Sequence, residues 1–307
     1  EVVSIETYPA KTEAQTLLQL LSEQSASAPG RLIYTFCAED GTRTALTLSE
    51  LDRRARAIAG RLQQTVKPGD RALLVYPAGL DFITGFFGCI YAGVLPVPAS
   101  YPKPNRPMPR LSAICHDCDA AVALTTAQTL DTLQAVRTSS EFHSVEWLPS
   151  DRIDDAHADR WRRPNITPDD LALLQYTSGS TSQPRGVKVA HRHLLNNLEM
   201  IYQGFDVDGL HADGAKRVGV FWLPAYHDMG LIGGILSSLY SDGHAFLLSP
   251  TAFLQRPVRW LRSISEFGAT VSGAPNFAYD LCVKRITPED RETLDLSKWR
   301  LAFCGAE

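Results

Sequence analysis

The residues best suited to chemistry lie in one short run, from Tyr176 to Gly186, which reads YTSGSTSQPRG. Six small residues, from Thr177 to Ser182, supply five hydroxyl groups and one glycine. Backbone N–H groups and hydroxyls in such a loop can converge on one anion, and Arg185 adds a fixed positive charge. The loop is not a Walker loop, because no G-x-x-x-x-G-K-[ST] is present and a strand rather than a helix follows. The pattern predicts a phosphate-binding loop.

The alternative for this loop is a flexible Ser/Thr linker. Two apolar runs that read as strands, 171–176 and 187–190, flank the loop directly, and Pro184-Arg185-Gly186 closes it. Linkers are seldom wedged between buried strands, so the phosphate-binding interpretation is favoured.

A second candidate stretch runs from Phe221 to Leu231 and reads FWLPAYHDMGL. It follows an apolar strand and opens a helix that is rich in Leu, Ile and Gly. A strand-to-helix junction at the carboxyl edge of a parallel sheet is where α/β proteins bind ligands. His227 there could contact a carboxylate or a phosphate, while Met229 and Leu231 could line an apolar tunnel. A single histidine, taken alone, is more often structural.

The six cysteines indicate no metal or redox site. Cys115 and Cys118 form a lone C-x-x-C, and a zinc site needs a second pair of ligands. We therefore expect these two residues to be helical thiols at or just below the surface.

The elements that must position these residues alternate between strands and helices along the chain. This rhythm predicts an α/β fold with mainly parallel, helix-covered sheets. Helices are expected over 12–25, from a capping box at Ser49 and Asp52 onward, over 81–91 before Gly93, and over 258–267 before Gly268. Strands are expected at 31–36, 42–47, 71–76, 120–125, 145–149, 171–176, 218–223, 244–248, 270–272 and 301–304.

Two segments interrupt this rhythm. The six prolines between Pro96 and Pro109 predict an extended crossing strap. The charged segment 150–170 predicts a surface excursion between two subdomains. We expect one α/β subdomain at 1–170 and a second at 171–307, which carries the phosphate loop and is incomplete at its carboxyl end.

The composition of the chain excludes several further classes of function. The chain has 307 residues, 44% of them hydrophobic, and a formal net charge of −4, so it can bury a large core. Lys and Arg are spread along the chain without the basic stripe of a nucleic-acid binder, so no nucleic acid is expected as a partner. Residues 1–9 do not resemble a signal peptide, and no apolar run reaches the roughly 20 residues of a membrane span. A cytoplasmic protein is expected.

These motifs resemble those of a known superfamily. The run 176–191, YTSGSTSQPRGVKVAH, is similar to the phosphate-binding signature of adenylate-forming enzymes, whose commonest form has Gly at position 182 and Lys at position 185. Arg185 keeps the positive charge. The phrase LPAYHDMGLIGG, at 223–234, resembles the corresponding motif of fatty acyl-AMP ligases. Further phrases of that branch are YPAGLDF at 76–82, YAGV at 91–94 and GAPNFAY at 273–279.

The resemblance implies the N-terminal domain of the adenylate-forming fold. It also implies activation of a fatty acid by ATP, with magnesium, to an acyl-adenylate, with release of pyrophosphate. The acyl group would pass to an acyl carrier protein of a polyketide or lipopeptide pathway.

The resemblance assigns catalytic roles to His227 and Arg185, and no metal ligand within this chain. The ATP phosphates would be held by Thr177, Ser178, Gly179, Ser180, Thr181, Ser182 and Arg185. The adenine would lie at Gly305, Ala306 and Glu307. The acyl chain would be bound by Met229, Leu231, Ile232, Gly233, Ser272, Ala274, Pro275, Asn276 and Tyr279.

Two alternatives stay open at this point: a long-chain fatty acyl-CoA synthetase, and a non-catalytic module that binds an acyl chain or an adenylate. The intact hydroxyl-rich loop with Arg185 argues against the non-catalytic module. The ribose-binding Asp, the magnesium-associated acidic residue and the catalytic Lys of the family would lie beyond Glu307. The 307 residues alone are therefore not expected to form an acyl-adenylate. Acyl chain length, the carrier protein, the choice between a stand-alone enzyme and a synthase module, and oligomeric state are not predicted.

Overall fold

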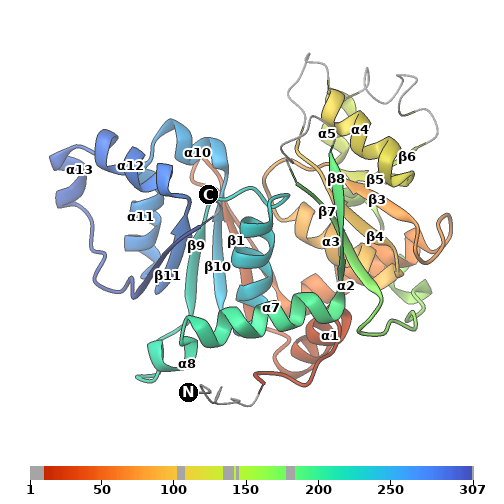
Figure 1. The fold of residues 1–307 in the computed structure, drawn as a ribbon, viewed down its shortest axis with the longest axis horizontal. Helices are drawn as coiled ribbons and strands as arrows, with labels where there is room; N and C mark the ends of the chain where they lie inside the picture. Colours follow the sequence, from red (N-terminus) through yellow and green to blue (C-terminus); the bar gives the residue numbers. More distant parts are fainter. Residues whose placement is uncertain (1–9, 102–107, 134–141, 143–144, 178–183, 306–307) are drawn as a thin grey trace, which may run out of the picture.

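The computed structural model describes residues 10–101, 108–133, 142, 145–177 and 184–305, which form two lobes (Figure 1). One lobe is built on a six-stranded sheet with the order β12-β11-β9-β10-β1-β2. Every pairing in it is parallel except the β1–β2 hairpin. Its strands are β1 (Leu32–Cys37), β2 (Arg43–Thr47), β9 (Val218–Phe221), β10 (His244–Leu248), β11 (Val271–Ala274) and β12 (Leu301–Cys304).

The other lobe is built on a four-stranded parallel sheet with the order β4-β3-β5-β6. A separate antiparallel ribbon, β7 with β8, lies against β4. The prediction of an α/β fold with mainly parallel sheets is confirmed. The strands of this lobe are β3 (Arg71–Leu74), β4 (Leu95–Pro98), β5 (Ala120–Thr125), β6 (Glu146–Pro149), β7 (Leu171–Thr177) and β8 (Arg185–Ala190).

Helices cover both faces of the six-stranded sheet. Side chains alternate along β9, so Val220 packs with Trp260 and Phe253 on one face, while Phe221 packs with Leu231 on the other. The Trp260 face is covered by α10 (Pro250–Gln255), α11 (Val258–Phe267) and α12 (Asn276–Arg285). The Phe221 face is covered by α7 (His191–Gly204), the π-helix η3 (Met229–Leu236) and α9 (Ser237–Tyr240).

Helix ends follow local chemistry. As predicted, α3 (Asp81–Ala92) and α11 end at glycines in the left-handed conformation, Gly93 with φ of 73° and Gly268 with φ of 58°. The capping box of α2 (Leu48–Leu62) was predicted two residues too late: it is formed by Thr47 and Glu50. Asp52 cannot cap the helix, because its buried carboxylate accepts a hydrogen bond from Tyr91 Oη at 2.7 Å.

The proline-rich strap begins as a strand. The N–H groups of Leu95 and Ala99 donate to the carbonyls of Asp70 and Leu74 at 2.8 and 3.1 Å. The backbone nitrogens of the alternate residues, 96 and 98, therefore face away from β3. Because β4 is an edge strand, Pro96 and Pro98 remove no ladder hydrogen bond. Residues 102–107 of the predicted strap lie outside the described residues, and α4 (Pro109–Cys118) begins directly after it.

The charged segment 150–170 packs against the lobe that contains the four-stranded sheet and does not merely cross its surface. Two 3-10 helices, η1 (Ser150–Arg152) and η2 (Asp155–Arg160), lie within it. Trp161 stacks on Tyr91 at 5.3 Å and donates from Nε1 to its carbonyl at 2.7 Å. Strand pairing crosses the predicted boundary at residue 170, because β1 and β2 join β10 in the six-stranded sheet.

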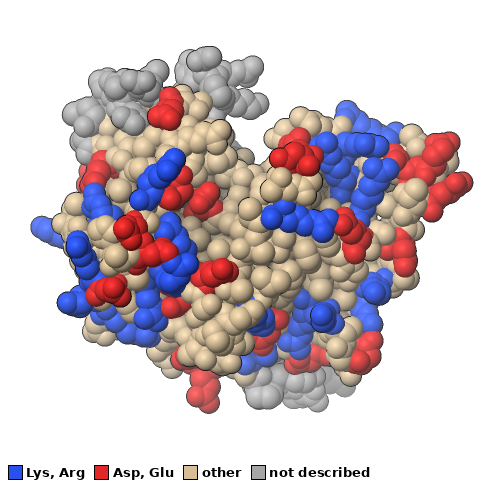
Figure 2. All heavy atoms as spheres, turned by 180° about the vertical axis from the view of Figure 1, so that it is seen from behind, with Lys and Arg blue, Asp and Glu red and all other residues tan. Residues whose placement is uncertain are grey.

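The surface mixes both signs of charge. Figure 2 shows Lys and Arg interleaved with Asp and Glu over the face opposite to that of Figure 1, and a hollow between the two lobes. Each helix in the described part of the chain is too short or too polar to cross a membrane.

A buried histidine joins the two halves of the chain. His191, the first residue of α7, is 1% exposed, and its Nδ1 accepts a hydrogen bond of 3.2 Å from the N–H of Leu17 at the start of α1 (Leu17–Ser27). Burial lowers the pKa of His191 to about 4, against a smaller opposing effect of Asp170. Protonation would remove the acceptor and place a charge in the core.

This histidine predicts a loss of stability in mild acid. Above pH 6.5 the His191 ring is neutral in the folded and in the unfolded protein. As the pH falls from 6.5 towards 4, His191 takes up a proton in the unfolded chain but not in the folded protein. The free energy of unfolding should fall by about 3 kcal/mol over this range because of His191 alone. His191→Gln keeps an acceptor that does not titrate, so urea unfolding of this variant should depend less on pH. The exposed His193→Gln is the matched control; equal pH dependence for His191→Gln and the parent protein would contradict the assignment.

Candidate active site

The two ends of the predicted phosphate loop are held side by side. Thr177 and Arg185 are direct partners in the antiparallel β7–β8 ladder, and both are exposed. The five residues between them that were assigned to the phosphates, Ser178, Gly179, Ser180, Thr181 and Ser182, lie outside the described residues. The ladder therefore fixes the stem of the loop and brings Arg185 to its base.

A tyrosine and a glycine hold this stem against the lobe that contains the four-stranded sheet. A Cβ on Gly186 would lie 2.9 Å from Cζ of its ladder partner Tyr176, so only glycine fits beside that ring. Tyr176 Oη donates a short hydrogen bond to the Asp117 carboxylate in α4, and burial raises the pKa of Tyr176 well above its usual range. The flanking Cys115 and Cys118 are buried, which raises their thiol pKa values to about 11 and 12. These thiols are therefore structural, and they are more deeply buried than the sequence predicted.

One side-chain hydrogen bond connects the loop stem to the second motif. Gln175, in β7 and 8% exposed, donates from Nε2 to the carbonyl of Tyr226 at 3.0 Å. The His227 segment is thereby tied to the strand that leads into the phosphate loop. The structure thus brings the two motifs together, as the site predicted from the sequence requires.

His227 lies at the surface with one ring nitrogen engaged. Its Nδ1 is 2.7 Å from Asp228 Oδ1, and the same carboxylate oxygen accepts a hydrogen bond of 2.6 Å from the N–H of Met229. The N–H of Met229 also lies 3.3 Å from this Nδ1, so Asp228 and the first residue of the π-helix both contact the same ring nitrogen. The side chain is 51% exposed, so its Nε2 can meet a ligand from the solvent side.

Met229 lies between two regions of the predicted site. A Cβ on Gly233 would lie 3.8 Å from Met229 Cγ, and a Cβ on Gly305 would lie 3.8 Å from Met229 Cε. Met229 therefore borders Gly305 of the predicted adenine segment and Gly233 of the predicted acyl segment. Ala306 and Glu307, the other predicted adenine residues, lie outside the described residues.

The helix that begins at Met229 is a π-helix, a rare, wider form that is frequently found at functional sites. Hydroxyl groups bind its carbonyls: Tyr34 donates to Ile235 at 2.9 Å, Ser237 to Gly233 at 2.5 Å, and Ser238 to Gly234 at 2.7 Å. At its start, a Cβ on Gly230 would lie 2.1 Å from the carbonyl oxygen of Pro224. Gly230 thus permits the tight turn that places His227 and Met229.

A mainly apolar cavity lies between α7, the π-helix and the six-stranded sheet. It contains about 530 Å³ of empty space, its open side included. Its apolar walls are formed by Leu198, Ile201, Phe205, Val207, Val218, Phe221, Val271 and Phe303, with Gly219, Gly233 and Gly243. Its polar lining residues are Tyr202, His211, Arg217, Ser237, Ser238, Tyr240 and Ser241. Apolar residues and glycines therefore make up most of its lining.

Of the predicted acyl-binding residues, Gly233 lines this cavity. Ser272 and Ala274 do not line this cavity, because their side chains point to the opposite face of the sheet. Ser272 Oγ donates to the carbonyl of Val220 at 2.5 Å and accepts from Trp260 Nε1 at 2.8 Å, and Ala274 belongs to the same core as Trp260. The reason is strand alternation: Val271 faces the cavity, so its neighbour Ser272 faces away.

The other predicted acyl-binding residues surround the cavity or lie outside it. Leu231 is fully buried in the core, while Ile232 and Pro275 are half-buried and Asn276 is exposed. Tyr279 Oη donates to the carbonyl of Phe303 at 2.7 Å. Tyr279 therefore holds the end of β12 just before Gly305.

Several lining residues were not predicted from the sequence. Phe205 and Phe303, whose rings lie 5.2 Å apart, come from the end of α7 and from β12. The apolar stripe of α7, with Leu194, Leu198 and Ile201, was a signal that one face of this helix is covered. It did not indicate which sheet face the helix covers, because that contact is tertiary.

The described ranges contain no group of three or more His, Cys, Asp or Glu residues that could hold a metal ion. Those ranges therefore hold no dedicated protein site for magnesium.

Comparison with known proteins decides the family. The model of a family described as AMP-binding enzyme matches residues 21–307. The chain belongs to this AMP-binding enzyme family. Its fold agrees: a fatty acyl-adenylate ligase from L. pneumophila, solved in complex with acyl adenylate and pyrophosphate, superposes with a TM-score of 0.89 at 37% identity. That match covers 97% of this chain and 50% of the ligase.

Curated relatives of this AMP-binding enzyme include two ligases. The medium-chain-fatty-acid–[acyl-carrier-protein] ligase JamA of Moorena producens is 43% identical over 305 residues, which is 97% of this chain and 50% of JamA. The long-chain-fatty-acid–AMP ligase FadD32 of Mycobacterium marinum is 36% identical over 288 residues, covering 90% of this chain and 44% of FadD32. The chain thus spans about half the length of the curated relatives it matches.

The contact between Gly186 and Tyr176 gives a testable prediction for the AMP-binding enzyme. Gly186→Ala places a methyl group within 3 Å of a ring held by Asp117, which should cost about 1–3 kcal/mol of stability. The loop stem should loosen, so the midpoint of thermal unfolding should fall. Gly204→Ala is the control, because a Cβ there meets no atom within 4 Å. Parent-like thermal stability for Gly186→Ala would contradict the assignment.

Proposed function

We propose that the whole protein uses ATP to activate a fatty acid as an acyl-adenylate. The observation that carries the proposal is the position of Met229, which borders Gly305 on one side and Gly233 of the apolar cavity on the other. An acyl chain in the cavity would present its carboxylate near His227, and a nucleotide at Gly305 would place its phosphates towards the β7–β8 loop. The L. pneumophila ligase, solved with acyl adenylate and pyrophosphate, supports this arrangement.

The reaction joins the two substrates at the α-phosphorus. A carboxylate oxygen of the fatty acid attacks the α-phosphorus of ATP, a new P–O bond forms, and the bond from the α-phosphorus to the bridging oxygen of the β-phosphate breaks. Pyrophosphate leaves with that oxygen. Negative charge builds on the phosphate oxygens, where the amides and hydroxyls of the 177–182 loop and the Arg185 guanidinium would stabilise it. His227 Nε2 would contact the carboxylate or an α-phosphate oxygen.

Magnesium would enter bound to the ATP phosphates. Mg²⁺ is commonly held by substrate phosphates with one or two carboxylates and water, and the described residues gather no acidic cluster of their own. The metal would neutralise charge on the phosphates when bound, whereas Arg185 contributes from the protein side.

The acceptor of the acyl group is proposed to be an acyl carrier protein. JamA, whose name specifies an acyl-carrier-protein ligase, supports this choice. FadD21 of Mycobacterium tuberculosis, 35% identical over 299 residues, is named as a fatty-acid–CoA ligase, so coenzyme A is the rival acceptor. Products formed by the whole protein with both acceptors present distinguish them: acyl carrier protein should be acylated, and predominant acyl-CoA would overturn the choice.

Arg185 gives the test of the phosphate site. Removing a cation from a phosphate contact should cost roughly 2–5 kcal/mol of binding, so Arg185→Ala should raise the KM for ATP at least about 30-fold. Fatty-acid affinity, measured by calorimetry on the whole protein, should stay near the parent value. Lys188→Ala removes an exposed cation from the same strand but outside the loop, so its ATP kinetics should not change. Unaltered ATP kinetics in Arg185→Ala would refute the phosphate site.

A further inference from the structure

The cavity reaches the edge of the sheet opposite to Met229. Met229 and Gly305 follow the carboxyl ends of β9 and β12, whereas Arg217 and Gly243 immediately precede β9 and β10. Because these strands run parallel, the two groups lie at opposite edges of the sheet. Arg217 and Gly243 line the cavity, and so does Phe221, the last residue of β9, so its walls extend across the sheet.

We propose that the loop 239–243, held by Arg217, is the floor of the acyl cavity and sets the longest fatty acid that the protein accepts. The inference rests on the proposed function, since it takes the cavity to be the acyl site. To the proposed function it adds Arg217 as the residue that determines specificity. It also predicts in which direction a substitution of Arg217 shifts the preferred length of the fatty acid.

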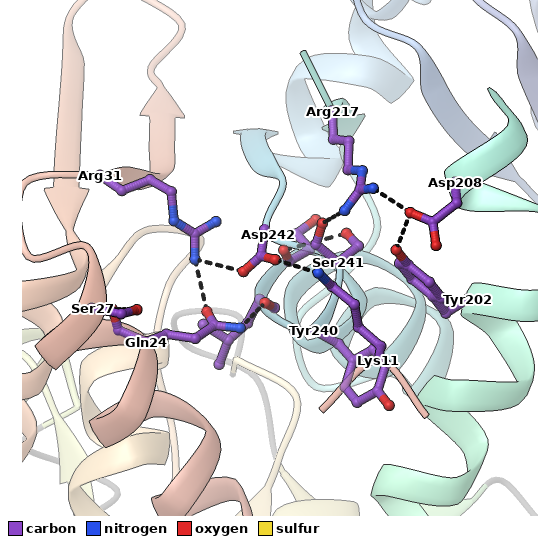
Figure 3. A network of polar contacts seen from close by, with 12 residues as sticks. Lys11, Gln24, Ser27, Arg31, Tyr202, Asp208, Arg217, Tyr240, Ser241 and Asp242 are labelled. Carbon is purple, nitrogen blue, oxygen red and sulfur yellow. Dashed lines mark hydrogen bonds and ion pairs between the residues drawn. The ribbon is translucent and has the colours of Figure 1, made fainter. Parts of the chain in front are cut away.

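Arg217 is held by three contacts, and Figure 3 shows the two polar ones. Its guanidinium donates to the carbonyl of Ser241 at 2.7 Å and pairs with Asp208 Oδ1 at 2.6 Å. It also lies over the ring of Tyr202, 5.6 Å from the centroid, and Tyr202 Oη donates to the same Asp208 oxygen at 2.5 Å. Arg217 thus ties the loop to the α7 side of the cavity.

The rest of the loop is held from outside the cavity. Lys11 Nζ lies 2.7 Å from Asp242 Oδ2 and Arg31 lies 3.3 Å from Oδ1, as Figure 3 shows. Gln24 Nε2 donates to the carbonyl of Leu239 at 2.9 Å. Asp242 has a φ of 57°, the left-handed region, so the loop holds a turn that these partners stabilise. Of these residues, Lys11, Gln24 and Arg31 do not line the cavity, whereas Arg217 does.

The chemistry of this floor differs from that of the walls. Each methylene buried between apolar walls should improve binding roughly fourfold. At the floor, a longer chain would have to displace the Arg217 guanidinium from the Asp208 carboxylate and the Ser241 carbonyl, and would lose both contacts. The gain per methylene therefore ends at Arg217, which makes the floor a chain-length limit.

The test compares kcat/KM across saturated fatty acids of increasing length, using pyrophosphate release by the whole protein. Arg217→Ala removes both hydrogen bonds and the side chain, so the optimum should move to longer acids, with about a fourfold gain for each methylene newly buried. Should Arg217→Ala fail to fold by circular dichroism, Arg217→Met replaces it, because it keeps an apolar stem but loses the charge; the same shift is expected.

Arg300→Ala is the matched control. Arg300 also donates to a backbone carbonyl, that of Leu210, and pairs with an aspartate, Asp213, at 2.5 Å, but it does not line the cavity. Its chain-length profile should equal that of the parent protein. An equal shift in Arg300→Ala and Arg217→Ala would overturn the proposal, because the effect would then not come from the floor.

A substitution in the cavity wall separates the floor from the proposed function. Gly233→Trp adds bulk where a Cβ meets only Met229 at 3.8 Å, so it should shorten the acids accepted. If Gly233→Trp shortens the profile and Arg217→Ala or Arg217→Met leaves the profile unchanged, the floor proposal is overturned while the acyl site stands. If no Gly233 or Arg217 variant shifts the profile, the cavity is not the acyl site and the floor proposal falls with it. The proposed function itself falls only if the whole parent protein releases no pyrophosphate with any fatty acid.

Discussion

Parallel pairing of β9, β10, β11 and β12 is the constraint on which the site depends. Because these strands share one direction, the segments that follow β9 and β12 emerge at one edge of the sheet, and Met229 meets Gly305 there. The same pairing places Arg217 and Gly243 at the other edge. One sheet face between the two edges then forms a wall of the cavity. The hydrogen bond from Gln175 to Tyr226 couples this lobe to the ribbon that carries Arg185.

The π-helix shapes the space beside the sheet. The hydroxyls of Tyr34, Ser237 and Ser238 donate to its carbonyls and hold it in place. Two of its glycines allow close approach: Gly230 fits against the Pro224 carbonyl, and Gly233 leaves the cavity wall clear. The cavity between this helix and the sheet reaches Arg217 at the amino ends of the strands.

Local signals in the sequence predicted most of this architecture. Glycine-terminated helices and the strands on either side of the phosphate loop follow from short-range patterns. The presence of the His227 segment in the same site as that loop was implied by the resemblance to adenylate-forming enzymes. Three features could not be predicted from local patterns. A short apolar strand does not reveal which of its alternating faces meets a cavity, so the sequence could not show that Ser272 faces away from it. The joining of β1 to β10 and the contact of Phe205 with Phe303 depend on tertiary packing between distant segments.

The most direct test of the account is to locate the acyl chain. A non-hydrolysable acyl-adenylate analogue with a photoreactive group near the end of its acyl chain would be crosslinked to the whole protein, and the labelled peptides identified by mass spectrometry. The account predicts labelling within 198–207 and 233–243, the segments of α7, the π-helix and the following loop that line the cavity. Labelling confined to α10, α11 and α12, on the opposite face of the sheet, would contradict it.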